Sequence, residues 1–157
     1  MTLVPASVRA PLLVFGWGNL SRGDDALGPL CVGALRERLP DALRHQVEFL
    51  EDYQLQIEHA LDLVGRTRVL LVDASLTCPV PFEVTPLCAA NDASFTSHAL
   101  SPQALLQVYQ NLRDEAAPPC TLLAIRGERF DLGEPPSANA RANLAAALQW
   151  TQRWLAQ

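Results

Sequence analysis

The sequence contains no lysine, and all 12 of its basic residues are arginine. The missing lysine excludes a Schiff-base lysine, a phosphate-loop lysine and a lysine general base. Against the arginines stand 17 carboxylates, which give a formal net charge of −5 at pH 7. Proteins that bind nucleic acid or an anionic membrane surface normally present a basic patch, so this charge balance argues against both classes.

Long apolar runs and paired cysteines are also missing. No run approaches the roughly 20 residues of a membrane span, and the short apolar stretch near the N-terminus does not resemble a signal peptide. The four cysteines are scattered without a CxxC pair, which is typical of reduced thiols in a cytoplasmic protein. A chain of 157 residues, 49% of them hydrophobic, predicts a single domain over residues 1–157.

Apolar runs typical of buried strands alternate along the chain with segments of helical spacing. The predicted strands are residues 11–16, 46–50, 68–73, 82–87 and 121–126, and the predicted helices are residues 24–39, 54–64, 101–112 and 137–155. The link between the third and fourth strands is too short for a parallel crossover, so the fourth strand should run antiparallel. The order βαβαββαβα therefore predicts an α/β fold, a three-layer α/β/α sandwich around a five-stranded mixed sheet with one antiparallel strand.

Ligands of such sheets bind beyond the carboxyl ends of the parallel strands. The first strand is followed by a Gly16-Trp17-Gly18 turn and then by two adjacent acids, Asp24 and Asp25. A dinucleotide site would need a third glycine in place of Ser21, and its pyrophosphate would meet the two carboxylates at the helix N-terminus. The pattern favours a cation over a nucleotide, although the two acids could simply cap the helix.

Two further residues could complete a metal site at this edge. Asp73 ends a fully apolar strand, and His98 precedes a helix after the fourth strand. Asp73 could instead cap a following helix, and a lone loop histidine such as His98 is more often solvated unless its loop folds back to the acids. Together Asp25, Asp73 and His98 would suit a transition metal such as zinc, nickel, manganese or iron better than magnesium.

Several other polar residues near strand ends allow two interpretations each. Asp52 ends the second strand and could approach the same pocket or cap the following helix. Arg126 ends the fifth strand and could bind a substrate carboxylate or a backbone carbonyl, or pair with Glu128. His45 and His59 have no comparable context, and we interpret both as surface residues.

These residues fall in an order that resembles the nickel–iron hydrogenase maturation proteases, which remove a C-terminal peptide from the precursor of the hydrogenase large subunit. The matching stretches are Gly16-Trp17-Gly18-Asn19 with the following acid pair and Gly28, Leu71-Val72-Asp73-Ala74, Thr96-Ser97-His98-Ala99-Leu100-Ser101, and Arg126-Gly127-Glu128 with Gly133 and the closing helix. They span nearly the whole chain. The resemblance implies the same α/β/α sandwich with one antiparallel strand among five.

The resemblance also implies a mechanism. Asp25, Asp73 and His98 would grip nickel that the precursor brings, so that the free enzyme, a cytoplasmic monomer, could be metal-free. The metal would polarise the scissile carbonyl, or a carboxylate of Asp25 or Asp52 would orient the attacking water. Many members carry a glycine-rich loop after the second strand, whereas this chain has Asp52-Tyr53-Gln54-Leu55-Gln56, which resembles the branch serving NAD-reducing hydrogenases.

Three rival functions place acids at the same edge. A signalling receiver domain also has acids after its first and third strands, but it requires a lysine after the fifth strand and an all-parallel sheet. A nucleotide-binding module could use the turn from Gly16 to Gly18, and a self-contained metallopeptidase would keep its own metal. Titration with a nucleotide tests the nucleotide-binding module. Assay of the metal content of the purified protein separates a self-contained metallopeptidase from a protease whose metal comes with the substrate.

Overall fold

The computed structural model describes residues 9–90 and 100–157. Within these residues the chain forms a five-stranded sheet in the order β2-β1-β3-β5-β4. The strands are β1 (Leu12–Trp17), β2 (Val47–Asp52), β3 (Arg68–Ser75), β4 (Phe82–Pro86) and β5 (Cys120–Arg126). The α-helices are α1 (Leu27–Arg38), α2 (Pro102–Arg113) and α3 (Ala138–Leu155), and the 3₁₀ helices are η1 (Gly23–Ala26), η2 (Asp41–Leu43) and η3 (Ile57–Leu63).

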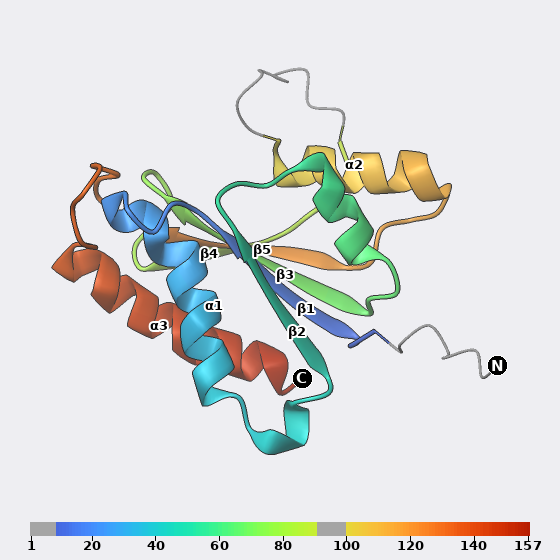
Figure 1. The fold of residues 1–157 in the computed structure, drawn as a ribbon, viewed down its shortest axis with the longest axis horizontal. Helices are drawn as coiled ribbons and strands as arrows, with labels where there is room; N and C mark the ends of the chain where they lie inside the picture. The colour runs from blue at the N-terminus through green and yellow to red at the C-terminus, as the bar shows by residue number, and fades with distance from the viewer. Residues whose placement is uncertain (1–8, 91–99) are drawn as a thin grey trace.

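Helices cover both faces of the sheet, which confirms the predicted three layers (Figure 1). One core lies between the sheet and helices α1 and α3, and it contains Val14, Leu70 and Val72. The other lies between the sheet and the helices η3 and α2, and it contains Phe15 and Leu71. Successive residues of β1 and β3 thus alternate between two apolar layers, which explains why these central strands are continuous apolar runs.

The predicted antiparallel strand is confirmed. β1, β2, β3 and β5 run parallel to one another, whereas β4 pairs antiparallel with β5. The four parallel strands therefore end at one edge of the sheet, and the loops that follow them lie together on the left in Figure 1.

The predicted caps of the last two helices are confirmed, and one predicted helix differs. The hydroxyl oxygens of Ser101 and Ser137 accept hydrogen bonds from the third residues of α2 and α3. The segment predicted as a helix over 54–64 is the 3₁₀ helix η3, with Gln56 as its N-cap. Ile57 and Leu61 supplied part of its helical apolar spacing, yet both side chains are exposed, so they do not fix an α-helix against the core.

None of the helices among the described residues is both long and apolar enough to cross a membrane. The four cysteines are all free thiols, and only Cys88 is exposed.

Candidate active site

The turn after β1 holds Asp25 in a fixed position. Gly18 has a φ of +148°, and a side chain there would collide with the backbone carbonyl of Asp25. The Asn19 N–H donates to Asp25 Oδ2 at 2.9 Å. Glycine at position 18 is therefore needed for the close approach that sets the direction of the Asp25 carboxylate.

The same turn offers no phosphate cradle. The Gly18 N–H donates to the Asp52 carbonyl oxygen, the Ser21 N–H to Asn19 Oδ1, and the Gly23 N–H to the Glu134 carbonyl oxygen. A phosphate loop needs backbone N–H groups that point at the ligand, and here oxygen atoms of the protein occupy them. This arrangement argues against the nucleotide-binding module.

Asp24 is fully buried and joins the turn to the C-terminal part of the chain. Its carboxylate accepts hydrogen bonds from the N–H groups of Glu128 at 2.7 Å and Ser137 at 2.6 Å, and from the Ser137 hydroxyl at 2.9 Å. Gly127 allows this approach, because a side chain there would lie 2.7 Å from the Asp24 Cβ. Burial acts to raise the pKa of Asp24, but the hydrogen bonds together outweigh it and hold the pKa below its usual value.

Asp25 and Asp73 come together at the carboxyl ends of β1 and β3. Asp73 lies in β3 and points to the same face as Leu71, which packs beneath α2 and η3. Its Oδ1 accepts a hydrogen bond from the Ala74 N–H at 2.8 Å. Burial, and secondarily the charge of Asp25, raise the pKa of Asp73 to about 7 against the effect of that hydrogen bond. The two carboxylates are therefore close enough to repel each other.

His98, the third predicted ligand, lies outside the described residues. Among residues 9–90 and 100–157, no three side chains of His, Cys, Asp or Glu form a group that could hold a metal. The described chain resumes at Leu100, immediately before α2, and α2 covers the face to which Asp73 points.

The raised pKa of Asp73 predicts a pH-dependent cost to stability. Since its pKa is about 7 in the folded protein and near 3.8 in the unfolded chain, stability is lost as the pH rises from about 4 to about 7. The Asp73→Asn variant does not titrate. We therefore compare the unfolding free energy of Asp73→Asn with that of the wild type at each pH. This difference should favour the variant more at pH 8 than at pH 5, by at most about 3 kcal/mol.

Urea unfolding of both proteins at the two pH values measures this difference. Asp41→Asn is a matched control, because Asp41 is an exposed carboxylate in η2. An advantage of Asp73→Asn that is equal at pH 5 and pH 8 would contradict the raised pKa.

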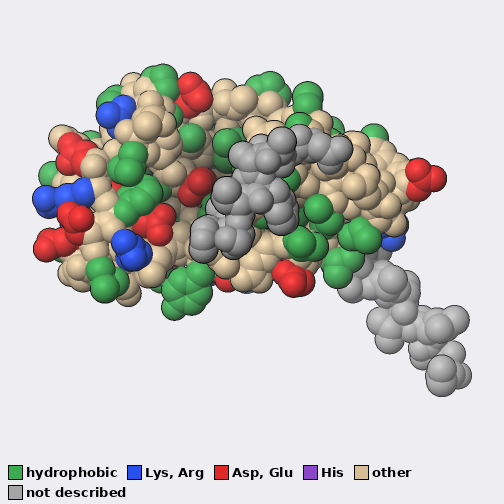
Figure 2. Space-filling view, turned by 90° about the horizontal axis from the view of Figure 1, so that it is seen from above, with side chains coloured by type: hydrophobic (Ala, Val, Ile, Leu, Met, Phe, Trp, Pro, Cys, Tyr) green, Lys and Arg blue, Asp and Glu red, His purple; other side chains and the backbone are tan. Residues whose placement is uncertain are grey.

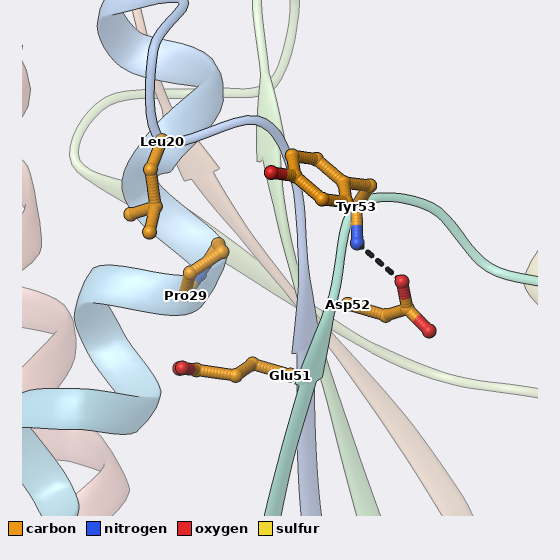
Figure 3. A pocket seen from close by; sticks show the side chains of 6 residues that line it. Leu20, Pro29, Glu51, Asp52 and Tyr53 are labelled. Carbon is orange, nitrogen blue, oxygen red and sulfur yellow. Dashed lines mark hydrogen bonds between the residues drawn. The ribbon is translucent and has the colours of Figure 1, made fainter.

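Asp52 lies at the same edge, on the strand beyond β1. It pairs with Trp17 in the β1–β2 register, and Trp17 follows the Gly16–Val72 pair of β1 and β3, so two strand spacings, about 10 Å, separate Asp52 from Asp73. Figure 3 shows that the side chains of Glu51 and Asp52 point to opposite sides of β2.

Asp52 does not cap a helix, because its carboxylate binds His59 and its own loop. Oδ1 accepts from the Tyr53 N–H at 2.7 Å, and Oδ2 lies 3.1 Å from His59 Nε2. The Gln56 N–H donates to His59 Nδ1 at 2.8 Å, so Nε2 carries the ring proton and donates to Asp52. The interpretation of His59 as a surface residue is wrong, since its side chain is only 12% exposed and its ring lies 4.5 Å from that of Phe15.

Arg126 binds backbone carbonyl groups. Its Nη1 donates to the Cys78 carbonyl oxygen at 2.6 Å, which ties the end of β5 to the loop after β3. Glu128 does not pair with Arg126 among the described residues and instead accepts a hydrogen bond from Asn139 Nδ2 at 2.5 Å. Of the predicted alternatives, the structure supports binding to a backbone carbonyl, here within the chain.

Comparison with known proteins relates this architecture to one group of solved structures. No protein-family model matches the sequence, and no curated protein matches it. The structure superposes on the [NiFe] hydrogenase maturation protease HycI from Thermococcus kodakarensis with a TM-score of 0.72 and 18% identity over 96% of both chains. The fold is that of the hydrogenase maturation proteases.

Two other solved structures agree. The hydrogenase maturating endopeptidase HybD from E. coli is 22% identical, with a TM-score of 0.70 over 92% of this chain and 91% of that chain. The hydrogenase 2 maturation peptidase from Thaumarchaeota archaeon SCGC_AB-539-E09 is 21% identical, with a TM-score of 0.62 over 92% and 97% of the two chains. The maturation-protease fold and the antiparallel β4 together exclude the all-parallel sheet of a receiver domain.

Proposed function

We propose that this chain is an endopeptidase that removes the C-terminal extension of a nickel-loaded [NiFe] hydrogenase large-subunit precursor. Asp25, Asp73 and His98 grip the nickel that the precursor carries. The observation that carries the proposal is the Asp25–Asp73 pair at the carboxyl edge of a sheet with the maturation-protease fold. Consistent with the free thiols among the described residues, the enzyme acts in the cytoplasm, and it acts as a monomer.

The chemistry of the acid pair suits a cation that arrives with the substrate. Asp25 Oδ2 and Asp73 Oδ1 each accept one backbone hydrogen bond, and each carboxylate has a second oxygen without a hydrogen bond among the described residues. Like charges this close destabilise each other, and a divalent cation between them relieves the repulsion. Carboxylate oxygens and one imidazole nitrogen form an acceptable donor set for nickel.

Each residue then has a role in peptide hydrolysis. Nickel, when bound, supplies a Lewis acid beside the scissile carbonyl. Asp25, Asp73 and His98 bind the precursor's metal and so place the scissile bond at the carboxyl ends of the strands. A carboxylate of Asp25 or Asp52 orients the attacking water and takes its proton, which passes to the leaving amine.

The two candidate carboxylates predict different results. Asp25→Asn is expected to lose turnover in either case, because Asp25 also grips the nickel, so the effect of Asp52→Asn decides. If Asp25 orients the water directly, Asp52→Asn keeps most of the turnover. If Asp52 does so, its hydrogen bond from His59 holds it in position, and both Asp52→Asn and His59→Ala lose turnover. Single-turnover rates of the variants on the loaded precursor separate the two carboxylates.

The experiment that tests the function is incubation of the purified protein with a panel of nickel-loaded large-subunit precursors, followed by intact-mass measurement. We expect one precursor to lose a single C-terminal peptide. The panel includes the precursor of an NAD-reducing hydrogenase, because the Asp52–Gln56 loop without glycine favours that branch. No cleavage of any loaded precursor would contradict the proposed function.

A further inference from the structure

Exposed apolar side chains gather on the loops that follow the parallel strands. Each of these loops presents at least one large apolar side chain with 44–73% of its surface exposed, and we call the set the apolar rim: Leu20 after β1, Tyr53 after β2, Leu76 and Val80 after β3, and Leu132 after β5. Figure 2 shows hydrophobic and charged side chains intermixed at the left-hand end, where these loops lie. Scattered single apolar residues are normal on a surface, but one on every loop of a single edge indicates a contact surface.

The loops of the apolar rim form one continuous structure. The Gly18 N–H of the loop after β1 donates to the Asp52 carbonyl oxygen at the end of β2. The Gly133 N–H of the loop after β5 donates to the Ser21 carbonyl oxygen of the loop after β1 at 2.7 Å. The hydrogen bond from Arg126 to the Cys78 carbonyl oxygen joins the end of β5 to the loop after β3. Since neighbouring loops are tied together, the rim presents a preformed surface.

A pocket lies within the rim beside the Gly18 turn. It has a volume of about 250 Å³ and is lined by Gly18, Leu20, Pro29 and Tyr53 together with the acids Glu51 and Asp52. Figure 3 shows the Tyr53 ring pointing across the pocket towards Leu20, with Pro29 on the same side as Leu20. Small-molecule sites usually occupy roughly 300–1,000 Å³, so this pocket suits a side chain of a protein partner better than a cofactor.

The charges inside the rim indicate what the partner carries. The rim loops follow the same parallel strands at whose carboxyl ends Asp25 and Asp73 come together. Its apolar residues would cover apolar surface of the partner, and the two acids at the same edge favour a positive charge on that partner. A folded protein with a metal cation next to its apolar surface satisfies both conditions.

We propose that the apolar rim docks the folded large-subunit precursor, with an apolar side chain of the precursor in the pocket between Leu20 and Tyr53. This inference rests on the proposed function and assigns its substrate-recognition surface. The rim orients the precursor so that its nickel meets the acid pair. Rim residues touch parts of the precursor away from the reacting bond, so they contribute equally to binding of the substrate and of the transition state.

The test compares rim variants with equally exposed apolar residues elsewhere. Tyr53→Ser and Leu132→Ser alter the rim, whereas Leu61→Ser on η3 and Leu112→Ser on α2 are matched controls with 59% and 63% exposure. We expect the rim variants to raise KM for the nickel-loaded precursor about tenfold and to leave kcat unchanged, because uniform binding energy appears in KM. The controls should leave both constants unchanged.

Several outcomes would overturn the docking surface. They are an unchanged KM in both rim variants, an equal rise in the controls, or a fall in kcat without a change in KM. Concentration-dependent dimerisation of the wild type that Leu132→Ser abolishes would assign the rim to a second copy of the chain instead. If wild-type protein cleaves no precursor, the proposed function fails, and calorimetric binding of the uncleaved precursor to the same variants still decides the docking surface.

Discussion

Asp25→Asn, Asp73→Asn and His98→Ala are each expected to lower processing of the nickel-loaded precursor by about 10²–10³-fold. Loss of one ligand displaces the metal and therefore the scissile bond, and misplacement by about 1 Å can cost roughly 10²-fold. Loss of a group that stabilises developing charge costs about as much. Intact-mass measurement of single-turnover cleavage gives the rates.

The controls for this prediction separate a lost grip from a lost fold. Asp41→Asn removes a carboxylate from an exposed pair with Arg44 and should cleave at the wild-type rate. Asp73→Asn should be at least as stable as the wild type at pH 8, so a loss of activity in this variant cannot come from unfolding. Wild-type rates in all three site variants would contradict the metal grip.

Asp24→Ala is expected to destabilise the fold more than any other single carboxylate substitution. The change leaves the partly buried N–H groups of Glu128 and Ser137 without their acceptor, and each unsatisfied group costs about 1–3 kcal/mol. Together they predict a loss of about 3–5 kcal/mol of unfolding free energy, or roughly 6–20 °C in Tm for a domain of this size. Thermal unfolding at pH 7 is the measurement.

The pH dependence of Asp24 follows from its lowered pKa. Its contribution to stability is fully present above the unfolded pKa near 3.8 and is lost as the pH falls through the folded pKa.

Asp131→Ala is the matched control for the thermal unfolding of Asp24→Ala, because Asp131 lies exposed in the loop that Asp24 helps to anchor. If Asp24→Ala lowers the Tm no more than Asp131→Ala does, the hydrogen bonds of the Asp24 carboxylate do not anchor this loop.

Much of the fold could be predicted because its signals are local. The apolar run that became β3 is buried on both faces and required no knowledge of distant residues. The antiparallel β4 followed from the length of one link, and Ser101 and Ser137 cap helices through bonds to residues three positions away. The helix predicted over 54–64 differs because whether Ile57 and Leu61 face the core depends on the tertiary structure.

The candidate site was predictable only in part, because its decisive contacts are distant in sequence. Asp24 and Asp25 have the same local pattern, yet the partners of Asp24 lie more than 100 residues away. The one sequence signal for that anchor was Gly127, whose missing side chain lets Asp24 approach. The contact between His59 and Asp52 could not be predicted, because it depends on how η3 places the His59 ring beside the Asp52 carboxylate.

Asp73, a proposed metal ligand, is expected to oppose stability. Its burial next to Asp25 raises its pKa, and the resulting cost to stability grows as the pH rises from about 4 to about 7. An apolar side chain at position 73 would not carry this pH-dependent cost to stability. The strain is expected of a carboxylate that waits for a cation, and the bound precursor should relieve it.

The most direct test of a substrate-supplied nickel is the metal dependence of cleavage. Metal-stripped protein is incubated with the same precursor in nickel-loaded and nickel-free forms, and the masses of the products are compared. Cleavage of the loaded form alone is predicted, and adding nickel to the protease before the nickel-free precursor should not restore it. Equal cleavage of both forms, or cleavage that depends only on metal bound to the protease, would contradict the metal grip by Asp25, Asp73 and His98.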